Sequence, residues 1–417
     1  MRFLHIADLH LGKALYGVSM IDNQDQVFWV ERFLEKAREL KPDAVLIAGD
    51  IYDRSAPSGE AVMLFNHMLT ELEKMAVPVL LTAGNHDSGK RLSFAGSILA
   101  KQKIYIAGVV EKEMVHVTVP ERDGSGEVTF WLLPYLFPAM AAQVLTDESI
   151  GDYETAVREL LARQKIDFSG RNVLLAHQNV TAGGKETPRG GSESMVGGVG
   201  QIDYRVFDGF DYVALGHIHA SYHVGRKEVR YAGSPLCYHF DETGQPEKGL
   251  LLVELGEKEG GVEITPLSIR PLHPMREIRG TYETILESLE QEEIRDEYLK
   301  IVVTDRRITP EMSELLREQF KNRGSIVLEL VSEFREFDAV SALSGEYNGE
   351  KLIEDYFVEL YRERKGQAQP GEKDLALFQF AAGQVRGRDS SEKREESLAA
   401  DAEKLLAYVL KQEVRGE

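Results

Sequence analysis

The sequence predicts an α/β fold in which two β-sheets form a sandwich flanked by helices, followed by a small α+β capping domain and a C-terminal helical arm. The first half repeats a short apolar strand, a polar loop and an amphipathic helix. The character changes near residues 269–274, where a compact pattern of strands and helices begins. Beyond about residue 346 the chain consists of charged helical pieces separated by hydrophilic linkers. Strands that alternate with helices are typical of sheets covered by helices.

The expected strands of the first half are short apolar runs rich in β-branched residues. They cover residues 2–7, 44–48, 79–83, 173–176 and 212–215, with further strands at 115–119, 128–133, 230–232 and 249–254. A period near 3.6 predicts a helix whose apolar face carries Val27, Val30, Leu34, Ala37 and Leu40. We expect Asp22 to cap this helix. A second helix is predicted over residues 58–75, and Pro78 prevents its continuation.

Three domains are expected: residues 1–270, a capping domain at 271–345 and the arm at 346–417. In the capping domain, helices are predicted at 281–292 and 310–322 and strands at 299–304 and 326–331. Thr309 and Pro310 form a cap with proline at the first helical position, and Gly324 closes that helix.

The arm carries two apolar stripes at helical spacing. One comprises Leu352, Ile353, Tyr356, Phe357, Leu360 and Tyr361, and the other Leu398, Ala402, Leu405, Leu406 and Val409. Short isolated helices are marginal in water, so these stripes need a surface to cover. That surface is either a partner protein, which we favour, or the capping domain of the same chain.

Composition and charge limit the classes of function that this chain can have. The chain has 417 residues, 43% of them hydrophobic and 28% charged, which is typical of a soluble globular protein. No apolar stretch approaches the ~20 residues that span a bilayer, and the first residues run directly into Asp8, so neither a membrane segment nor a signal peptide is expected. Cys237 is the only cysteine, which excludes an intrachain disulfide and favours the cytoplasm.

The net charge of −20 opposes a role in nucleic-acid binding. DNA affinity depends largely on neutralising phosphates, and DNA-binding domains are usually basic. Any contact with DNA must therefore come from local basic patches, bound metal ions or a partner subunit.

Acidic, amide and imidazole side chains follow directly after five of the expected strands. In strand order they are Asp8 and His10, Asp50, Asn85, His177, and His217 with His219. Ligands of open α/β sheets bind outside the carboxyl ends of the strands, so these loops are expected to meet at one edge. Gly49, Gly84 and Gly216 precede three of these groups, where we expect the backbone to turn tightly.

These seven residues are the candidate metal ligands. They are too many for one tetrahedral ion and suit two ions that share a bridging carboxylate, with water completing the coordination. Imidazole, carboxylate and amide donors together favour Mn, Fe or Zn. Two such ions about 3.5–4 Å apart can activate a water and stabilise an in-line displacement at phosphorus.

The usual role of a histidine near a strand end is structural, and we assign that role to His5, His67, His116, His223, His239 and His273. The other five of the eleven histidines lie in strand-end loops beside Asp or Asn, which favours a functional site.

Two glycine-rich segments permit other interpretations. Residues 84–90 match the GxxxxGK pattern of a phosphate-binding loop, but Arg91 stands where that motif needs Ser or Thr to hold magnesium. A nucleotide-binding loop is therefore disfavoured. The run from Gly183 to Gly200 contains no such motif and is either a mobile loop near the site or a disordered surface loop.

Five motifs resemble those of the calcineurin-like metallophosphoesterase superfamily. They are Asp8-Leu-His10, Gly49-Asp50-Ile-Tyr-Asp53, Gly84-Asn-His-Asp87, Ala176-His177 and Gly216-His-Ile-His219. Within that superfamily, Ala176-His-Gln-Asn179, the glycine-rich run and Tyr231-Ala-Gly-Ser-Pro235 resemble the SbcD family, the nuclease subunits of bacterial SbcCD complexes. The resemblance covers about residues 1–270, and the layout of the remainder agrees with the family.

The resemblance assigns a role to each motif residue. One metal ion is assigned to Asp8, His10 and His219, the other to Asn85, His177 and His217, with Asp50 bridging the two ions. His86 is implied as the catalytic histidine that binds no metal and either protonates the leaving oxygen or stabilises the transition state. Asp87 either orients that imidazole or is a solvated surface carboxylate. Asp53 stands where archaeal and eukaryotic relatives carry a second histidine, so a second catalytic histidine is not expected.

The activity implied by the resemblance is Mn-dependent cleavage of double-stranded DNA ends and DNA hairpins. The family works as a homodimer with the SbcC ATPase in DNA repair, and we expect it in the cytoplasm at the nucleoid. Two alternatives stay open. A small-molecule phosphodiesterase suits the acidic charge but gives no role to residues 271–417. A non-catalytic scaffold of the same fold is opposed by the complete ligand set.

Overall fold

The computed structural model describes residues 1–184, 200–244, 248–291 and 295–334, together with a few short pieces between 358 and 374. The chain divides into two units, Met1–Arg335 and Glu336–Glu417. Apart from the short pieces, the predicted helical arm with its two stripes lies outside the described residues, as do residues 185–199 of the glycine-rich run.

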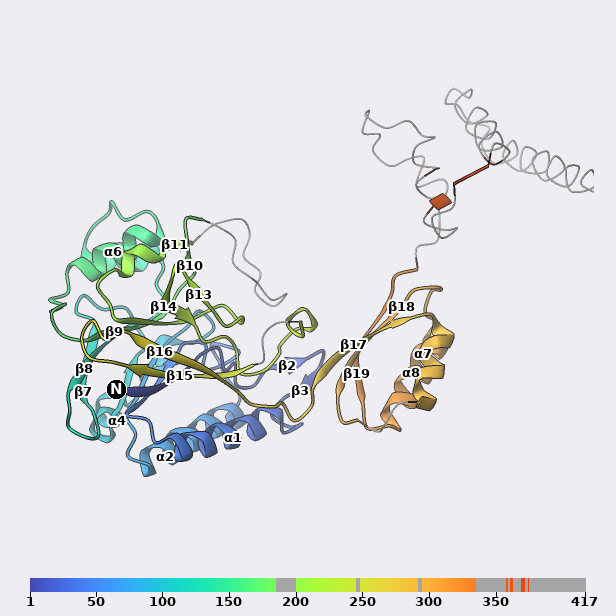
Figure 1. The fold of residues 1–417 in the computed structure, drawn as a ribbon, viewed down its shortest axis with the longest axis horizontal. Helices are drawn as coiled ribbons and strands as arrows, with labels where there is room; N and C mark the ends of the chain where they lie inside the picture. Colours follow the sequence, from blue (N-terminus) through green and yellow to red (C-terminus); the bar gives the residue numbers. More distant parts are fainter. Residues whose placement is uncertain are drawn as a thin grey trace, which may run out of the picture. The chain divides into compact units, whose positions relative to one another are not determined.

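Two six-stranded sheets form the centre of the unit Met1–Arg335 (Figure 1). The first has the order β16-β15-β1-β4-β5-β6. Strands β1, β4, β5 and β6 run parallel, and β15 pairs antiparallel with both β1 and β16. The bounds are β1 Arg2–Ile6, β4 Ala44–Ala48, β5 Val79–Thr82, β6 Ile104–Ala107, β15 Gly249–Leu255 and β16 Val262–Ser268.

The second sheet has the order β13-β14-β12-β9-β8-β7, with β8, β9, β12 and β14 parallel and the two edge strands antiparallel. The bounds are β7 Val115–Pro120, β8 Glu127–Leu133, β9 Asn172–His177, β12 Tyr212–Gly216, β13 Tyr222–Val224 and β14 Arg226–Tyr231. One apolar cluster joins the two sheets, in which Phe3 lies 5.8 Å from Phe130 and 5.6 Å from Tyr212 between ring centroids. The predicted two-sheet sandwich is thereby confirmed.

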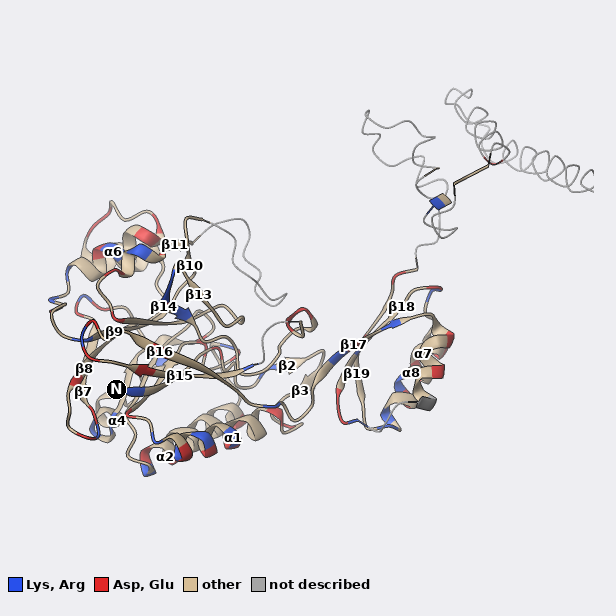
Figure 2. Ribbon diagram, viewed as in Figure 1, with Lys and Arg blue, Asp and Glu red and all other residues tan. Residues whose placement is uncertain are grey.

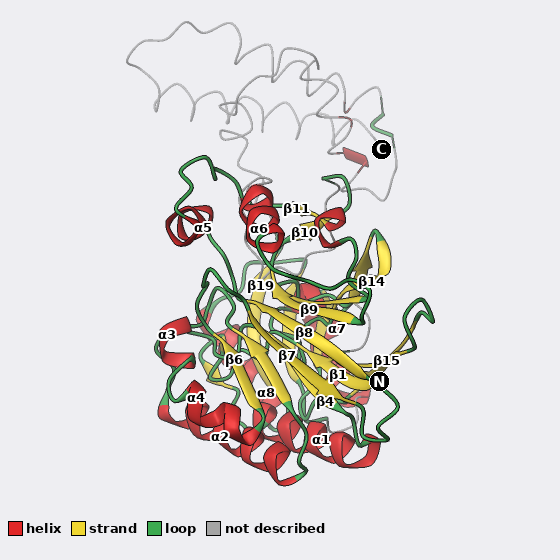
Figure 3. Cartoon of the chain, turned by 90° about the vertical axis from the view of Figure 1, so that its left-hand side faces the viewer, coloured by secondary structure: helices red, strands yellow, loops and turns green. Residues whose placement is uncertain are grey.

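Helices cover the outer face of each sheet. Helices α1 (Asp25–Leu40) and α2 (Gly59–Lys74) share a core with the first sheet, and their outward faces carry charged residues (Figure 2). Helices α5 (Pro138–Leu145) and α6 (Tyr153–Ala162) pack on the second sheet, and Figure 3 shows the sheets between the two helix layers. Helices α3 (Gly89–Leu92) and α4 (Gly96–Leu99) follow β5. Among the described residues, no helix combines the length and apolar character needed to cross a membrane.

The predicted cap of α1 is wrong, whereas the cap of α2 follows the usual rule. Helix α1 begins at Asp25 after Gln24, which has a φ of 69° and makes no side-chain cap, so Asp22 lies outside the helix. The Ser58 hydroxyl accepts a hydrogen bond from the Ala61 N–H at 3.3 Å, which satisfies one free donor of the first turn of α2.

The C-terminal part of this unit is a three-stranded parallel sheet in the order β17-β18-β19, connected by α7 and α8. The bounds are β17 Met275–Gly280, α7 Tyr282–Gln291, β18 Tyr298–Val303, α8 Pro310–Lys321 and β19 Ile326–Ser332. The sequence pattern does not predict β17, because Met275-Arg-Glu-Ile-Arg-Gly280 is largely polar, as an edge strand can be. This part has an apolar core of its own. The ranges 1–270 and 271–345 remain proposals for the domain bounds.

The C-terminal sheet is joined to the rest of the unit by buried polar contacts. The Tyr298 hydroxyl donates to the Asp25 carboxylate at 2.5 Å, and His273 Nδ1 lies 2.8 Å from the other oxygen of Asp25. The Asn23 amide also donates to the Tyr298 hydroxyl, at 2.5 Å. Asp25 is buried, so these partners satisfy a carboxylate that would otherwise be costly to bury.

Candidate metal centre

The side chains that follow β1, β4, β5, β9 and β12 converge at the carboxyl ends of these strands. Asp50 lies between the loops of the two sheets: its Oδ2 is 3.6 Å from His10 Nε2 and 3.4 Å from His177 Nε2. Asp8 links β1 to β12, because its Oδ1 accepts a hydrogen bond from the His217 N–H at 2.9 Å. The ligand loops therefore come from both sheets of the sandwich, and they meet at one end of it.

One group of donors is formed by Asp8, His10 and His219. Their donor atoms lie within 4.8 Å of one another, and the Nε2 atoms of His10 and His219 are 3.2 Å apart. Asp8 Oδ2 and His10 Nδ1 are buried without a hydrogen-bond partner among the described residues. Two imidazole nitrogens that face each other beside a buried, unpaired carboxylate oxygen fit a cation between them.

A second group is formed around Asn85. Its Oδ1 is 3.1 Å from His177 Nε2 and 3.0 Å from His217 Nδ1, so the amide oxygen and the two imidazoles meet. Asp8, Asp50 and His177 also place donor atoms within 4.8 Å of one another. The structure thus brings all seven predicted ligands together in two adjoining groups that share Asp50.

Burial keeps two imidazoles of this cluster in the neutral form that binds metal ions. It lowers the pKa of His217 to about 3 and that of His10 well below its ordinary value, so both imidazoles stay neutral. Burial also raises the pKa of Asp8 to about 7, because a carboxylate removed from water lacks a neutralising charge. Burial also lowers the pKa of His177, but the Asp50 carboxylate outweighs it and raises that pKa to about 9, so His177 gives up a proton when a metal ion binds. Imidazole and carboxylate donors are the groups that bind divalent ions, so the donor set fits them.

Four of the seven residues have backbone conformations that L-amino acids rarely adopt. The φ angle is 53° at Asp8, 42° at His10, 48° at Asp50 and 105° at His217. Residues with positive φ cluster at functional sites, where the surrounding structure holds them in place. The strain here turns each side chain toward the same point at the strand ends.

The glycines before the ligands act mainly by allowing close approach. A Cβ at Gly84 would lie 2.1 Å from Asp50 Oδ1, and a Cβ at Gly216 would lie 1.8 Å from the Ala48 oxygen. Of these three glycines, only Gly49 has a positive φ, of 79°. The expected tight turn therefore explains Gly49, whereas Gly84 and Gly216 are needed because any side chain would displace a ligand loop.

Comparison with known proteins agrees with this geometry. Residues 1–221 match the family of calcineurin-like phosphoesterases, and residues 271–365 match the type 5 capsule protein repressor C-terminal domain. The SbcD subunit of the SbcCD nuclease of Staphylococcus saprophyticus is 31% identical over 304 residues, which are 72% of this chain and 77% of that protein. The chain belongs to the SbcD family of calcineurin-like phosphoesterases. A solved structure, that of TT1561 from Thermus thermophilus, shares 13% identity at a TM-score of 0.34 over 63% of this chain and 97% of its own, a likeness too weak to inform function.

His86, in the third ligand loop of this SbcD-family chain, is exposed at the mouth of the cluster. Its ring centroid is 4.8 Å from that of His10, and its donor atom lies within 4.8 Å of donors from His10 and Asp50. The Asp53 carbonyl oxygen is 2.9 Å from His86 Nδ1 and holds the ring. The backbone of Asp53, and not the side chain of Asp87, therefore orients this imidazole.

Both interpretations of Asp87 are wrong. Its carboxylate is directed neither to the His86 ring nor to solvent, because it accepts hydrogen bonds from the backbone N–H groups of Ile51, Tyr52 and Gly84 at 2.9–3.1 Å. Asp87 thereby ties the loop that carries Asp50 to the loop that carries Asn85. Its role is to hold two ligand loops together.

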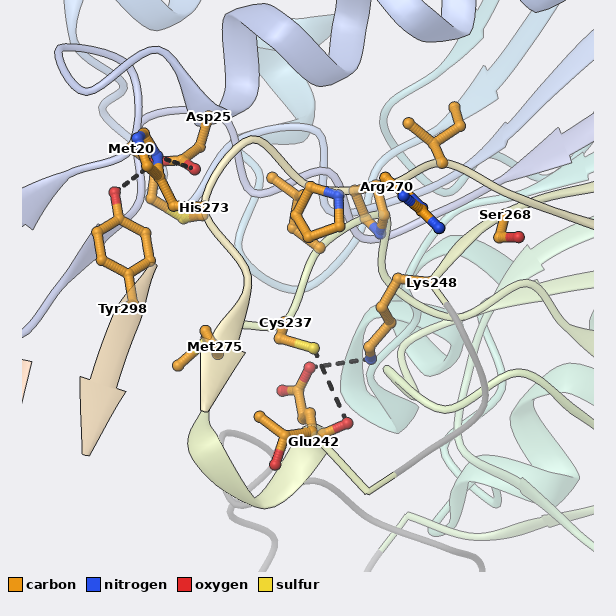
Figure 4. A pocket seen from close by; sticks show the side chains of 15 residues that line it. Met20, Asp25, Cys237, Glu242, Lys248, Ser268, Arg270, His273, Met275 and Tyr298 are labelled. Carbon is orange, nitrogen blue, oxygen red and sulfur yellow. Dashed lines mark hydrogen bonds and ion pairs between the residues drawn. The ribbon is translucent and has the colours of Figure 1, made fainter. Parts of the chain in front are cut away.

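Sequence reasoning missed one pair of residues that supports this SbcD-family site. Glu242 Oε1 accepts a hydrogen bond from His219 Nδ1 at 3.0 Å, and Glu242 Oε2 is 2.9 Å from Lys248 Nζ (Figure 4). Burial raises the pKa of Glu242, but His219 and Lys248 outweigh it and hold that pKa well below the usual range. The carboxylate fixes the tautomer of His219 with the proton on Nδ1, so that Nε2 presents its lone pair toward His10, where a metal ion would bind. No motif marks Glu242, because it lies 23 residues after His219, at the end of the short 3₁₀ helix Phe240–Glu242.

Replacing this carboxylate tests its support of His219. Glu242→Gln is expected to weaken binding of one Mn²⁺ ion by about 10–100-fold, the usual effect of removing such a supporting group. Calorimetric titration of chelator-treated protein with Mn²⁺ measures this affinity. Glu254→Gln, which removes a surface partner of Arg2, is the matched control. Unchanged Mn²⁺ affinity in Glu242→Gln would show that His219 needs no carboxylate partner.

Proposed function

We propose that the chain is a DNA phosphodiesterase that uses two divalent ions, of which Mn²⁺ is the preferred species. The seven converging residues are the proposed metal ligands. The observation that carries the proposal is the position of Asp50, whose Oδ2 lies within 3.6 Å of both His10 and His177. One ion is assigned to Asp8, His10 and His219, and the other to Asn85, His177 and His217. When bound, the ions supply positive charge at the phosphate and an activated water.

The protein groups have separate tasks in this hydrolysis. His86, exposed beside the donors and held by the Asp53 carbonyl, delivers a proton to the leaving oxygen or stabilises charge on the phosphate. Tyr238 donates to the Leu9 carbonyl at 2.5 Å and keeps the first ligand loop in place.

Local basic residues offset the acidic net charge where DNA would enter. Lys13 Nζ lies 2.8 Å from Asp53 Oδ1, the exposed Arg54 follows in sequence, and Arg91 donates to the Ser55 carbonyl at 3.0 Å. These cations surround residues 53–55, which also hold His86. Cations placed beside the catalytic groups neutralise the phosphates that flank the scissile bond.

The name of the SbcD relative, a subunit of the SbcCD nuclease, supports a proposal for substrate and assembly. We infer exonuclease action on double-stranded DNA ends and endonuclease action on hairpins, within a DNA repair complex that contains an SbcC-type ATPase. The place of action is the cytoplasm, at the nucleoid.

We also infer a homodimer within that complex. Met63 on α2, Phe94 between α3 and α4, and Ile98 on α4 are large apolar side chains with exposed fractions of 65–80%. Apolar side chains left in water favour association with another protein surface. They are therefore candidates for the contact between two copies of the chain.

Turnover of two substrates tests the proposed function against a small-molecule phosphodiesterase. In Mn²⁺, the protein is expected to hydrolyse duplex DNA with a higher kcat/KM than a small phosphodiester, and excess chelator is expected to abolish both activities. Hydrolysis of the small ester alone, with or without the ATPase partner, would favour the alternative function. No hydrolysis at full metal occupancy would favour a scaffold.

The helical arm is proposed as the docking element for the ATPase. Deletion of residues 346–417 is expected to leave metal-dependent cleavage of simple substrates nearly intact and to abolish co-purification with the ATPase, because the two apolar stripes would be lost with the arm. Pull-down of the ATPase by full-length and truncated protein measures this. A truncated chain that binds the ATPase with unchanged affinity would show that docking lies elsewhere.

A further inference from the structure

An aromatic segment lies between the second sheet and α5. After β8, the side chains of Tyr135, Leu136 and Phe137 alternate between the surface and the core. Leu136 is buried, whereas the Phe137 side chain is 48% exposed. Tyr135 and Phe137 therefore share the face that points away from the core, and their ring centroids are 5.0 Å apart.

This segment adjoins the proposed metal ligands. The Tyr135 ring centroid is 6.0 Å from that of His217 and 6.1 Å from that of His177. The Tyr135 N–H donates to the Ala83 carbonyl at 2.9 Å, which ties the segment to the strand end that leads to Asn85. The rings of His217, Tyr135 and Phe137 thus form a continuous row that starts at the metal centre and ends in solvent.

The row is rigid. Tyr153 of α6 packs beside it, with ring centroids 6.5 Å from Tyr135 and 6.2 Å from Phe137. A platform that is already held in place loses little conformational entropy when a ligand binds.

Phe137 occupies a position where local structure does not favour phenylalanine. It is the N-cap residue of α5, makes no side-chain cap and precedes Pro138. Ser, Thr, Asp or Asn at an N-cap satisfies a free N–H and stabilises a helix. Capping does not account for phenylalanine at this position, and the contacts with Tyr135 and Tyr153 leave the ring 48% exposed. A flat ligand that stacks on the ring would cover the exposed part.

We propose that Tyr135 and Phe137 form a subsite that stacks the nucleobase next to the scissile phosphate. This inference rests on the proposed function as a DNA phosphodiesterase. The base of a nucleotide lies one sugar away from its phosphate, so a phosphate at the metal centre places the base along the row of rings. Aromatic side chains stack any base because every base has a π-face. A base inside a duplex is already stacked on its neighbours, so the subsite selects a nucleotide whose base is unpaired, as at a frayed end or in a hairpin loop.

Phe137 variants test the subsite through a comparison of two single-stranded oligonucleotides, one of them abasic at the residue beside the scissile phosphate. For the base-bearing oligonucleotide, Phe137→Ala is expected to raise KM by about 5- to 150-fold, the equivalent of about 1–3 kcal/mol of stacking, with a much smaller change in kcat. In Phe137→Ala, the kcat/KM for the base-bearing oligonucleotide divided by that for the abasic one should fall to about one. Phe137→Trp, which keeps a flat ring, should restore the wild-type ratio, whereas Phe137→Leu should not.

A control variant and a binding measurement separate the subsite from the proposed function. Phe168→Ala removes a 42% exposed ring near the amino end of β9, opposite the site, and should leave both oligonucleotides unaffected. In chelator-treated protein, a 2-aminopurine base in the oligonucleotide should be quenched by wild type and much less by Phe137→Ala. Equal loss of kcat/KM for both oligonucleotides, or equal quenching in wild type and variant, would overturn the subsite. Absence of DNA cleavage by wild type would overturn the proposed function, and the quenching result would then decide on the subsite.

Discussion

Asp50→Asn is expected to abolish phosphodiester hydrolysis and to weaken the binding of both metal ions. Burial raises the pKa of Asp50, but the imidazoles of His177 and His10 outweigh it and hold that pKa well below its usual range, so the side chain is an anion. Asparagine has the same shape without the charge, and its oxygen can still accept the backbone N–H of His86, which donates to Asp50 at 2.9 Å. The fold should therefore survive while the shared anionic ligand is lost.

The measurements are metal content after dialysis, hydrolysis in Mn²⁺ and the melting temperature. Asp211→Asn is the matched control, because Asp211 is a carboxylate that accepts from the Asn172 N–H at 2.7 Å at the amino end of β9, away from the ligands. That control should keep both ions and full activity. Full activity of Asp50→Asn, or of wild type in excess chelator, would contradict a mechanism that depends on two ions.

The sandwich and the ligand cluster could be predicted because both depend on local patterns. Strand β4 is buried at every position, and a run of five apolar residues bounded by polar ones already indicates such a strand. His10, Asp50 and His177 each follow or end a strand, and parallel strands bring their carboxyl ends to one edge whatever the details of packing. Residue type and position relative to a strand therefore predicted which side chains would meet.

The remaining features depend on contacts between distant residues. Asp25 is the first residue of a helix, but the partners of its side chain, His273 and Tyr298, lie more than 240 positions away in the C-terminal part. Asp87 adjoins His86 in sequence, yet its carboxylate is turned to the backbone of the Asp50 loop. Glu242 accepts a hydrogen bond from His219, but no hydrophobic periodicity in the sequence indicates the turn that brings the two together. Sequence spacing does not determine side-chain direction in loops, so these three roles required the structure.

His86→Ala is expected to lower hydrolysis by about 10²–10⁴-fold, the usual contribution of general acid–base catalysis, while both metal ions stay bound. The ring is exposed and oriented by the Asp53 carbonyl at 2.9 Å, so its removal leaves no buried group without a partner. Single-turnover rates at saturating DNA measure the chemical step, and DNA affinity should stay close to that of wild type.

Metal content decides between the two roles that the geometry of His86 allows. Its donor atom lies within 4.8 Å of donors from His10 and Asp50, so the alternative to a catalytic role is that His86 binds a metal ion. His67→Ala, which removes an exposed imidazole paired with Glu31 at 2.7 Å on the surface, is the matched control and should change neither rate nor metal content. Loss of one ion from His86→Ala would show that His86 is a metal ligand. A variant that hydrolyses slowly but retains both ions would show that His86 acts on the leaving oxygen or on the charge of the transition state.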